Sequence, residues 1–220
     1  MRNELAQNIS RIIEPLQDYV RRILENDQPS EREDQLQEGA QFVAGRLLDG
    51  RDAKLTFICT HNSRRSHLSH VWAEVAARFY GLDRVQTFSG GTEATACNPR
   101  TVQAFVRAGF SVEIPDGGQE NPRIKVHHAT DGEPIVCFSK IYVEPGNPSS
   151  DYAAMMCCSD VDEKCPVVEG AAIRIPLHYD DPKAADDTPE EEQRYDERCW
   201  QIGNDMFQMM ALVAASRNTV

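Results

Sequence analysis

The segment 55–66 constrains this chain more than any other, because it joins an apolar run to a helical pattern through a short polar loop. The run from Leu55 to Ile58 is apolar and predicts the end of a buried strand. Beyond Ser66, apolar residues recur at helical spacing, at Leu68, Val71, Trp72, Val75 and Phe79. We therefore expect Cys59 at the carboxyl end of a strand, with a loop that opens a helix.

The loop after Cys59 has the composition of an oxyanion cradle. A loop between a strand and a helix turns backbone N–H groups inward, and the helix N-terminus adds its own. Arg65 can direct two N–H donors onto an anion, and Ser66 can donate to a thiolate. Because the same positive field favours an ionised thiol, we expect Cys59 to be a nucleophile. The residues expected to bind the oxyanion are Thr60, His61, Asn62, Ser63, Arg64, Arg65 and Ser66.

The spacing Cys-x5-Arg-Ser from Cys59 to Ser66 resembles the phosphate loop of cysteine-dependent phosphatases. With Asn62 inside the loop and a strand before it, the segment is most similar to the low-molecular-weight protein tyrosine phosphatase superfamily. The stretch Phe88-Ser89-Gly90-Gly91, with the later Asn98-Pro99-Arg100, resembles the strand that returns beside the catalytic loop in that superfamily. A buried strand cysteine without a catalytic role is the alternative.

Strand and helix patterns alternate along the chain. Short apolar runs predict strands at 54–59, 85–88, 152–157 and 173–177, and helical signals mark 66–80, 98–108 and a long segment from Thr188. This alternation is typical of an α/β fold, a doubly wound parallel sheet flanked by helices. The pair Asp131-Gly132 predicts a hairpin of strands 123–128 and 134–139.

Residues 1–50 are expected to be a helical extension in front of a catalytic domain at 51–220. Helical periodicity predicts one helix as far as Glu25. Ser30 with Glu33 predicts a capping box for a second helix through Leu48. These helices are not part of the minimal fold that the resemblance implies. They are expected either to cover an exposed face or to form the interface of a homodimer.

Charge and composition exclude some functions for this chain of 220 residues. Its formal net charge is −12, which argues against a nucleic-acid partner, and an anionic substrate must be drawn by a local positive site. No apolar run reaches the ~20 residues of a membrane span, and the N-terminus has no apolar signal region. We therefore expect no membrane contact and a cytoplasmic location, where the seven cysteines stay thiols.

A second cysteine motif runs from Cys158 to Pro166, after a predicted strand. In open parallel sheets, sites form at the carboxyl ends of strands, so Cys158 is expected near Cys59. The stretch closely resembles the redox segment of thioredoxin-coupled arsenate reductases, a branch of the same superfamily. That motif contains Cys-Ser-Asp-Ala-Asp, two variable residues and Cys-Pro, and only Val161 departs from it. The resemblance implies that Cys158 and Cys165 relay oxidation away from Cys59.

Two other roles for these cysteines stay open. Zinc bound by Cys157, Cys158, Cys165 and His178 is one, although adjacent cysteines rarely reach one metal and there is no Cys-x2-Cys pair. We expect no metal and no cofactor. A structural role is the simplest interpretation for Cys157, Cys97, Cys137 and Cys199. In a helix, the seven-residue separation of Cys158 and Cys165 is a rise of ~10.5 Å, so a helical segment must unwind before the two can join.

A third motif, Tyr179-Asp180-Asp181-Pro182, resembles the late loop that overhangs the phosphate cradle in the superfamily. The resemblance implies that Asp181 is the general acid, and Asp180 is the second candidate for that role. The alternative is an acidic loop that is merely solvated. Lys183-Ala184-Ala185 replaces the aromatic residues that stack on phosphotyrosine, which argues against that substrate. His61 replaces a common glycine, and Arg64 replaces a cysteine or aliphatic residue.

The sequence therefore favours a cysteine-dependent arsenate reductase. The resemblance implies that Cys59 attacks arsenate held by Arg65, that Asp181 protonates the departing oxygen, and that Cys158 and Cys165 pass a disulfide to thioredoxin. One alternative is a low-molecular-weight protein tyrosine phosphatase that hydrolyses phosphate monoesters, in which the cysteine pair protects the nucleophile. Another is a redox-sensing, phosphate-binding module. Arsenate and phosphate are tetrahedral dianions of similar size, so the sequence leaves the substrate open.

Overall fold

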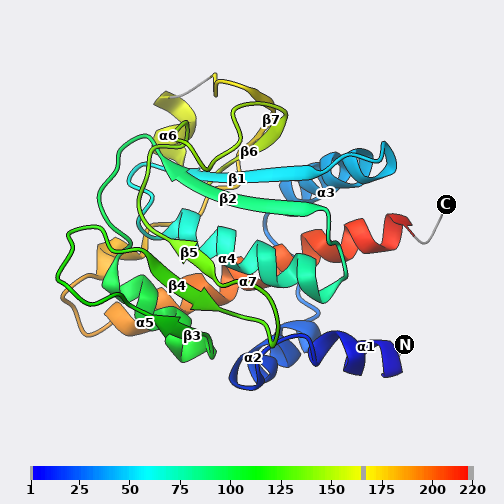
Figure 1. The fold of residues 1–220 in the computed structure, drawn as a ribbon, viewed down its shortest axis with the longest axis horizontal. Helices are drawn as coiled ribbons and strands as arrows, with labels where there is room; N and C mark the ends of the chain where they lie inside the picture. The colour runs from blue at the N-terminus through cyan, green and yellow to red at the C-terminus, as the bar shows by residue number, and fades with distance from the viewer. Residues whose placement is uncertain (1, 165–166, 218–220) are drawn as a thin grey trace.

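The computed structural model describes residues 2–164 and 167–217, and a four-stranded parallel sheet lies at its centre (Figure 1). The strands run in the order β2 (Val85–Gly91), β1 (Ala53–Cys59), β6 (Tyr152–Met156) and β7 (Ala171–Ile175). Every neighbouring pair is parallel, so the carboxyl ends of all four strands meet at one edge of the sheet. The predicted α/β fold with a parallel sheet and flanking helices is confirmed.

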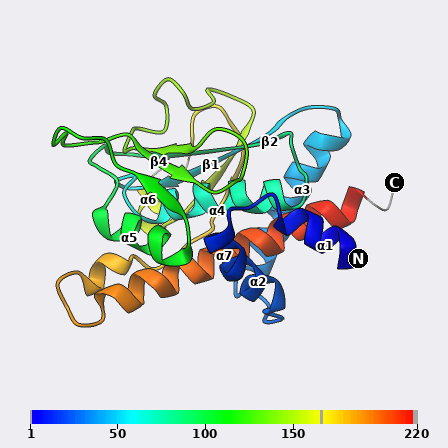
Figure 2. The same cartoon turned by 60° about the horizontal axis from the view of Figure 1, so that its bottom comes forward.

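Helices pack on the sheet and on one another. In chain order they are α1 (Arg2–Ile9), α2 (Glu14–Glu25), α3 (Glu33–Leu48), α4 (Arg65–Phe79), α5 (Pro99–Ala108), α6 (Ser159–Lys164), the 3₁₀ helix η1 (Pro182–Ala185) and α7 (Glu191–Arg217). α4 contacts β1 and β2, and the long α7 lies beside α4 (Figures 1 and 2). Within the described part of the chain, we find no helix long and apolar enough to cross a membrane.

The N-terminal region departs from its predicted helix pattern in two places. The single helix expected as far as Glu25 is broken into α1 and α2, because Pro15 cannot continue a helix from the preceding residues. The predicted capping box is wrong. Arg32 precedes α3 without a side-chain cap, and the Ser30 hydroxyl instead accepts a hydrogen bond from the Arg32 backbone N–H at 3.0 Å.

The region between α5 and β6 forms a small antiparallel sheet. Its strands are β3 (Ser111–Glu113), β4 (Ile124–His127) and β5 (Ile135–Cys137), in that order. β4 and β5 pair antiparallel around the turn that contains Asp131-Gly132, so the predicted hairpin is confirmed. The residues after β5 return to the central sheet, where the isolated bridge between Gly91 and Ile141 brings this segment beside β2.

A single apolar core links the N-terminal helices to the central sheet. Leu16 and Val20 of α2 are fully buried and belong to the same cluster as Trp72 of α4. Tyr19 stacks on Trp72 with ring centroids 5.3 Å apart, and Phe110 meets Trp72 edge-on at 5.1 Å. The apolar face of α2 is therefore used inside the chain, as expected of a helical cover. The division at residue 50 stays a prediction.

Candidate active site

Cys59 is the last residue of β1 and lies at the carboxyl edge of the sheet, almost fully buried. Its Sγ is 3.1 Å from the Oγ of Ser66, in the first turn of α4. The same Ser66 oxygen accepts a hydrogen bond from Asn62 Nδ2 at 2.9 Å. Because the oxygen is occupied as an acceptor, the Ser66 hydroxyl hydrogen is free to point at the sulfur. The pair is thus arranged to stabilise a thiolate at the end of the strand.

The loop between Cys59 and α4 is held open from outside. Its carbonyl groups are bound by three external donors: Thr60 by the Glu93 N–H at 2.8 Å, His61 by the Ser139 hydroxyl at 2.8 Å and Ser63 by the Asn98 N–H at 3.0 Å. The N–H that follows a carbonyl in a planar peptide points the opposite way. The outward carbonyls therefore leave N–H groups facing the interior, as an oxyanion cradle requires.

Asn62 gives the loop its sharp bend. Its φ is 43°, in the left-handed region that asparagine tolerates better than most residues. Its side chain is fully buried, and its Oδ1 accepts a hydrogen bond from the Lys140 N–H at 3.0 Å. The bend is thus fixed from both sides, by Ser66 in the first turn of α4 and by the backbone of Lys140.

Gly91 sits opposite Cys59 in the register of β1 and β2. A Cβ at this position would lie 2.6 Å from the Thr60 carbonyl oxygen and 2.8 Å from the Asn62 nitrogen. Both are backbone atoms of the loop, so no side chain fits there without displacing the loop itself. This close approach is the physical reason for the second glycine in the Gly90-Gly91 pair.

Arg65 joins the loop to the distant segment that contains Asp181. Its Nη1 donates to the Tyr179 carbonyl at 2.9 Å and its Nη2 donates to Asp181 Oδ2 at 2.7 Å. The side chain is largely buried, and its Nε has no hydrogen-bond partner among the described residues. A buried donor without a partner is costly, so the guanidinium group is suited to accept an additional anionic ligand.

The two neighbouring acids of the third motif have different surroundings. Asp181 caps η1, where its Oδ1 accepts from the Lys183 N–H at 3.1 Å, and it faces Arg65. Asp180 is 99% exposed and, among the residues that the structure describes, forms an ion pair with Arg198 at 3.6 Å. Both line a groove of about 910 Å³ between η1 and α7. The structure thus brings Asp181, rather than Asp180, to the phosphate-type loop.

Hydrogen bonds among Arg64, Tyr195 and Asp186 hold the segment that contains Asp181 in place. Arg64 Nε donates to the Tyr195 hydroxyl at 2.7 Å, and its Nη2 donates to Asp186 Oδ2 at 3.1 Å. Burial raises the pKa of Tyr195, so the hydroxyl keeps its proton and donates to Asp186 Oδ1 at 2.8 Å. The Arg64 side chain is thus engaged in this triangle, and its Nε also lies 4.0 Å from Asp181 Oδ1. No pattern in the sequence predicted a role in the site for Tyr195 or Asp186.

Cys158 lies near the loop, one residue before α6, and is almost fully buried. Its Sγ is 3.7 Å from the Thr60 hydroxyl. Cys165 lies outside the described residues, so its predicted approach to Cys158 stays a prediction. The residues between the two cysteines form the helix α6. This is the helical state from which the segment would have to unwind before the two cysteines could join. The α6 residue Asp162 anchors this helix, because Arg174 lies at 2.5 Å and His178 at 3.1 Å from its carboxylate.

Cys97, Cys137, Cys199 and the side chain of His61 take no part in the loop interior. The His61 side chain turns outward to Glu93, at 3.5 Å. Cys97, Cys137 and Cys199 are free, buried thiols, and burial raises the pKa of Cys137 and of Cys199 to about 12. Protonated buried thiols are poor nucleophiles, which agrees with their predicted structural role.

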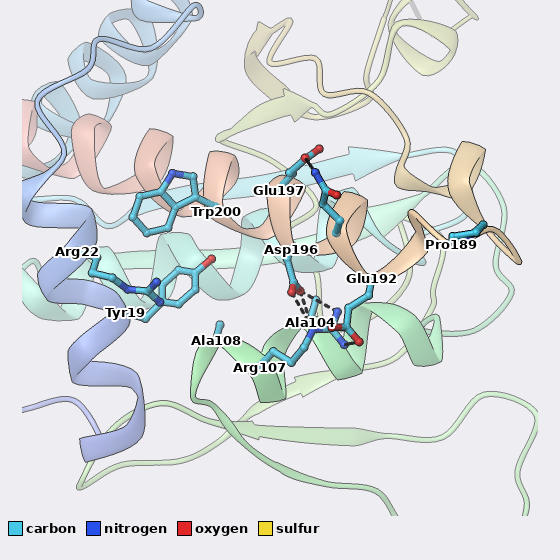
Figure 3. A pocket seen from close by; sticks show the side chains of 11 residues that line it. Tyr19, Arg22, Ala104, Arg107, Ala108, Pro189, Glu192, Asp196, Glu197 and Trp200 are labelled. Carbon is cyan, nitrogen blue, oxygen red and sulfur yellow. Dashed lines mark hydrogen bonds and ion pairs between the residues drawn. The ribbon is translucent and has the colours of Figure 1, made fainter.

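A separate hollow lies between α2, α5 and α7, far in sequence from the loop (Figure 3). Its volume is about 700 Å³, and none of the predicted site residues lines it. Arg22 stacks over Tyr19 and Trp200, while Arg107 pairs with Asp196 at 2.7 Å across the hollow. Its charged groups are thus largely satisfied by one another, and the described residues that the sequence predicts for the site lie elsewhere.

Two solved structures of phosphatases are similar to this chain at low sequence identity. A low-molecular-weight phosphotyrosine phosphatase from Vibrio cholerae O395 has a TM-score of 0.46 and 13% identity, covering 76% of this chain and 97% of its own. The YwlE arginine phosphatase has a TM-score of 0.47 and 12% identity, covering 76% and 99%. The fold described above rests on the sheet topology rather than on these two comparisons.

Curated relatives are more informative at the level of sequence. No family model matches the chain. The arsenate reductase of Bacillus licheniformis is 28% identical over 142 residues, which are 64% of this chain and 83% of that protein. The arsenate reductase of Bacillus subtilis strain 168 is 27% identical over 149 residues, 67% and 88% of the two chains. The chain is therefore similar in sequence to curated bacterial arsenate reductases, and the resemblance predicted from its cysteine motifs is confirmed.

Proposed function

We propose that this protein is an arsenate reductase that uses Cys59 as its nucleophile. The observation that carries the proposal is the constellation at the sheet edge: Cys59 with its Ser66 hydroxyl, and Arg65 paired with Asp181 directly above the same loop. This arrangement provides a nucleophile, an anion-binding guanidinium and a proton donor in one place. The names of the curated relatives support the choice of arsenate.

Binding of arsenate rearranges Arg65. In the structure its fork holds Asp181 and the Tyr179 carbonyl. A dianion in the cradle offers a stronger acceptor than one carboxylate oxygen, so the fork turns to the arsenate and releases Asp181. Asp181, released from Arg65, takes up a proton from solvent. Cys59 then attacks arsenic, the bond from arsenic to its hydroxyl group breaks, and Asp181 gives its proton to that hydroxyl, which leaves as water. The Arg65–Asp181 pair thus keeps the acid near the loop until substrate arrives.

A second thiol resolves the arsenic adduct. Cys158 attacks the Sγ of Cys59, the sulfur–arsenic bond breaks, and its electron pair stays on arsenic, which leaves as arsenite. Cys165 then attacks Cys158 and frees Cys59, and thioredoxin reduces the Cys158–Cys165 disulfide. Residues seven apart in a helix are too distant for a disulfide, so we propose that α6 unwinds during each turnover. Unwinding moves Cys158 away from Thr60 and separates Asp162 from Arg174 and His178.

The compartment and the assembly are part of the same proposal. A thiol relay needs a reducing environment, which a cytoplasmic location supplies, and all six described cysteines are free thiols. The predicted homodimer through the N-terminal helices stays a prediction. Since the apolar residues Leu16, Val20 and Ile23 lie in the chain's own core, such a dimer would have to use another surface of these helices.

The proposal is tested by following arsenite release with thioredoxin, thioredoxin reductase and NADPH. The wild-type protein should give many arsenite molecules per chain. Cys165→Ser should stop after one turnover and accumulate a Cys59–Cys158 disulfide, detected by peptide mass mapping. The same variant should hydrolyse p-nitrophenyl phosphate at nearly the wild-type rate, because water resolves a phosphocysteine without a second thiol. Cys199→Ser, a buried thiol outside the relay, is the matched control and should behave as wild type.

The phosphatase alternative has its own signature in these experiments. The same Cys59 and Asp181 suit a phosphate monoester, whereas the absence of aromatic side chains at 183–185 disfavours phosphotyrosine. Efficient hydrolysis of phosphotyrosine, with no arsenate-dependent oxidation of thioredoxin by the wild-type protein, would assign the chain to the phosphatases and overturn the reductase proposal.

A further inference from the structure

Cys157 lies directly beside the nucleophile in the sheet. The parallel register of β1 and β6 pairs Ile58 with Met156, and the Cys157 N–H donates to the Ile58 carbonyl at 2.7 Å. This bond carries the register one residue further, to Cys59 and Cys157. Neighbouring strands lie about 4.8 Å apart. That spacing is within the Cα separation of roughly 4.4–6.8 Å that a disulfide needs.

The two thiols also face the same helix. Cys59 Sγ meets Ser66 at 3.1 Å, and Cys157 Sγ is 3.7 Å from the hydroxyl of Ser69. Ser66 and Ser69 are three residues apart in α4, and residues at this spacing lie on one face of a helix. Both sulfur atoms therefore project from the same side of the sheet, one turn of α4 apart.

Cys158 projects in the opposite direction. Side chains alternate between the two faces along extended backbone, so the residues that follow Cys59 and Cys157 are expected on the other face. In agreement, Cys158 Sγ lies 3.7 Å from the hydroxyl of Thr60. In the reduced protein Cys157 thus already shares a face with the nucleophile, whereas Cys158 must turn to reach it.

The electrostatics of Cys157 agree with this placement. Burial is the main cause that raises the pKa of Cys157, and the charge of Cys59 is the next. Ser69 and Arg65 act in the opposite direction. The charge of Cys158 raises the pKa of Cys157 as well. Once the Cys59 sulfur is bonded to arsenic or oxygen it is no longer a thiolate, so one of the three effects that keep Cys157 protonated is removed at the moment when a resolving thiolate is needed.

We propose that Cys157 is a second resolving thiol for Cys59. The arsenate route rests on the proposed function: the Cys157 thiolate attacks Cys59 Sγ, the sulfur–arsenic bond breaks with its electron pair on arsenic, and arsenite leaves. The hydrogen peroxide route is independent of that function, and in it the Cys59 thiolate is first oxidised to sulfenic acid with loss of hydroxide. Cys157 then attacks that sulfur, and hydroxide leaves and takes up the thiol proton as water. Both routes give a Cys59–Cys157 disulfide.

This disulfide is a holding state. Both cysteines are buried, so an external reductase cannot reach them. Cys158 recovers the enzyme by attacking Cys59 Sγ and releasing the Cys157 thiol, which returns the oxidation to the Cys158 relay. The buried disulfide also protects Cys59 from further oxidation, since a sulfenic acid that finds no thiol proceeds to sulfinic acid.

The test uses Cys158→Ser, which removes the other resolving thiol. After hydrogen peroxide, alkylation and tryptic digestion without reductant, Cys59 lies in peptide 55–64 and Cys157 is the sole cysteine in peptide 141–164. We expect these two peptides to be linked in Cys158→Ser and unlinked in Cys157→Ser/Cys158→Ser and in Cys157→Ala/Cys158→Ser, with circular dichroism confirming the folds. Cys97→Ser/Cys158→Ser, which loses a buried thiol elsewhere, should keep the link.

The arsenate arm is measured in the same variants without thioredoxin. Cys158→Ser should release one arsenite per chain, and the rate should rise about tenfold per pH unit between pH 7 and pH 9, following the thiolate fraction of a thiol with raised pKa. A Cys158→Ser protein whose Cys59 passes to sulfinic acid with no linked peptide would overturn the proposal. If the wild-type protein releases no arsenite but the peroxide link forms in Cys158→Ser, the proposed function fails and the role of Cys157 stands.

Discussion

Lowering the pH from 7.5 to 5.5 should weaken the fold through three histidines whose pKa values are lowered by burial, among them His67 and His128. His67 in α4 is fully buried and His128 after β4 is 4% exposed. Burial, with Lys140 near His67 and Arg78 near His128, lowers the pKa of His67 to about 3 and that of His128 to about 4. Both therefore stay neutral in the folded protein over this range. In the unfolded chain each takes up a proton below its ordinary pKa of ~6.5.

The sign and size of the effect follow from this difference. A depressed folded pKa gives stability that is present above the unfolded pKa and is lost as the pH falls towards the folded one. For a group of pKa ~6.5 that stays neutral when folded, the step from pH 7.5 to 5.5 favours the unfolded state about tenfold, or about 1.4 kcal/mol. Burial also lowers the pKa of His70 well below its ordinary value, so it behaves in the same way. The three histidines together give about 4 kcal/mol, a large part of the 5–15 kcal/mol that is usual for a folded protein.

Urea unfolding followed by tryptophan fluorescence at the two pH values measures this loss. Burial raises the pKa of Glu74 and of Asp205, and these carboxyls act in the opposite sense, so the comparison of variants is more informative than the total. His128→Gln should lose about 1.4 kcal/mol less than wild type between pH 7.5 and 5.5. His127 is the partly exposed neighbour that pairs with Glu113, and the variant His127→Gln should lose as much unfolding free energy as wild type over this range. Equal losses in wild type and His128→Gln would refute the reasoning.

Three further variants test the site. Gly91→Ala should lose oxyanion binding and about 1–3 kcal/mol in urea unfolding, because its Cβ meets loop backbone, whereas Gly45→Ala in α3, with nothing within 4 Å, should gain about 0.5–1 kcal/mol. Asp181→Asn should slow hydrolysis of phenyl phosphate by ~10²-fold or more and of p-nitrophenyl phosphate less, with Asp180→Asn near wild type; the reverse order would exclude Asp181 as the acid. Tyr195→Phe should cost about 1–3 kcal/mol in urea unfolding, and an unchanged midpoint would show that its bonds to Arg64 and Asp186 do not hold the loop.

Local patterns allowed several parts of the structure to be predicted. The strand, loop and helix around Cys59 follow one another within a single short segment, and the spacing of apolar residues there depends only on the geometry of each element. The hairpin around Asp131-Gly132 was predictable because the turn residues set the pairing. The break at Pro15 was also present in the sequence, since proline excludes a continuous helix, but the helical periodicity on either side hid it.

Partners far apart in the chain could not be predicted from local patterns. Arg65 and Asp181 are 116 residues apart, and their 2.7 Å contact depends on how β1, β7 and η1 pack together. The triangle of Arg64, Tyr195 and Asp186 likewise depends on the rotation of α7 about its axis. The residues of the loop do not determine that rotation.

The cysteines divide in the same way. The sequence by itself determined that Cys59 ends a strand and opens a loop before a helix, and it predicted that Cys158 begins a redox motif, because both depend on short spacings along the backbone. Only the tertiary structure decided that Cys157, expected to be a structural residue, shares a face of the sheet with Cys59. The reason is register: a shift of one residue between β1 and β6 would exchange the faces of Cys157 and Cys158, and that register is fixed by packing over the whole sheet.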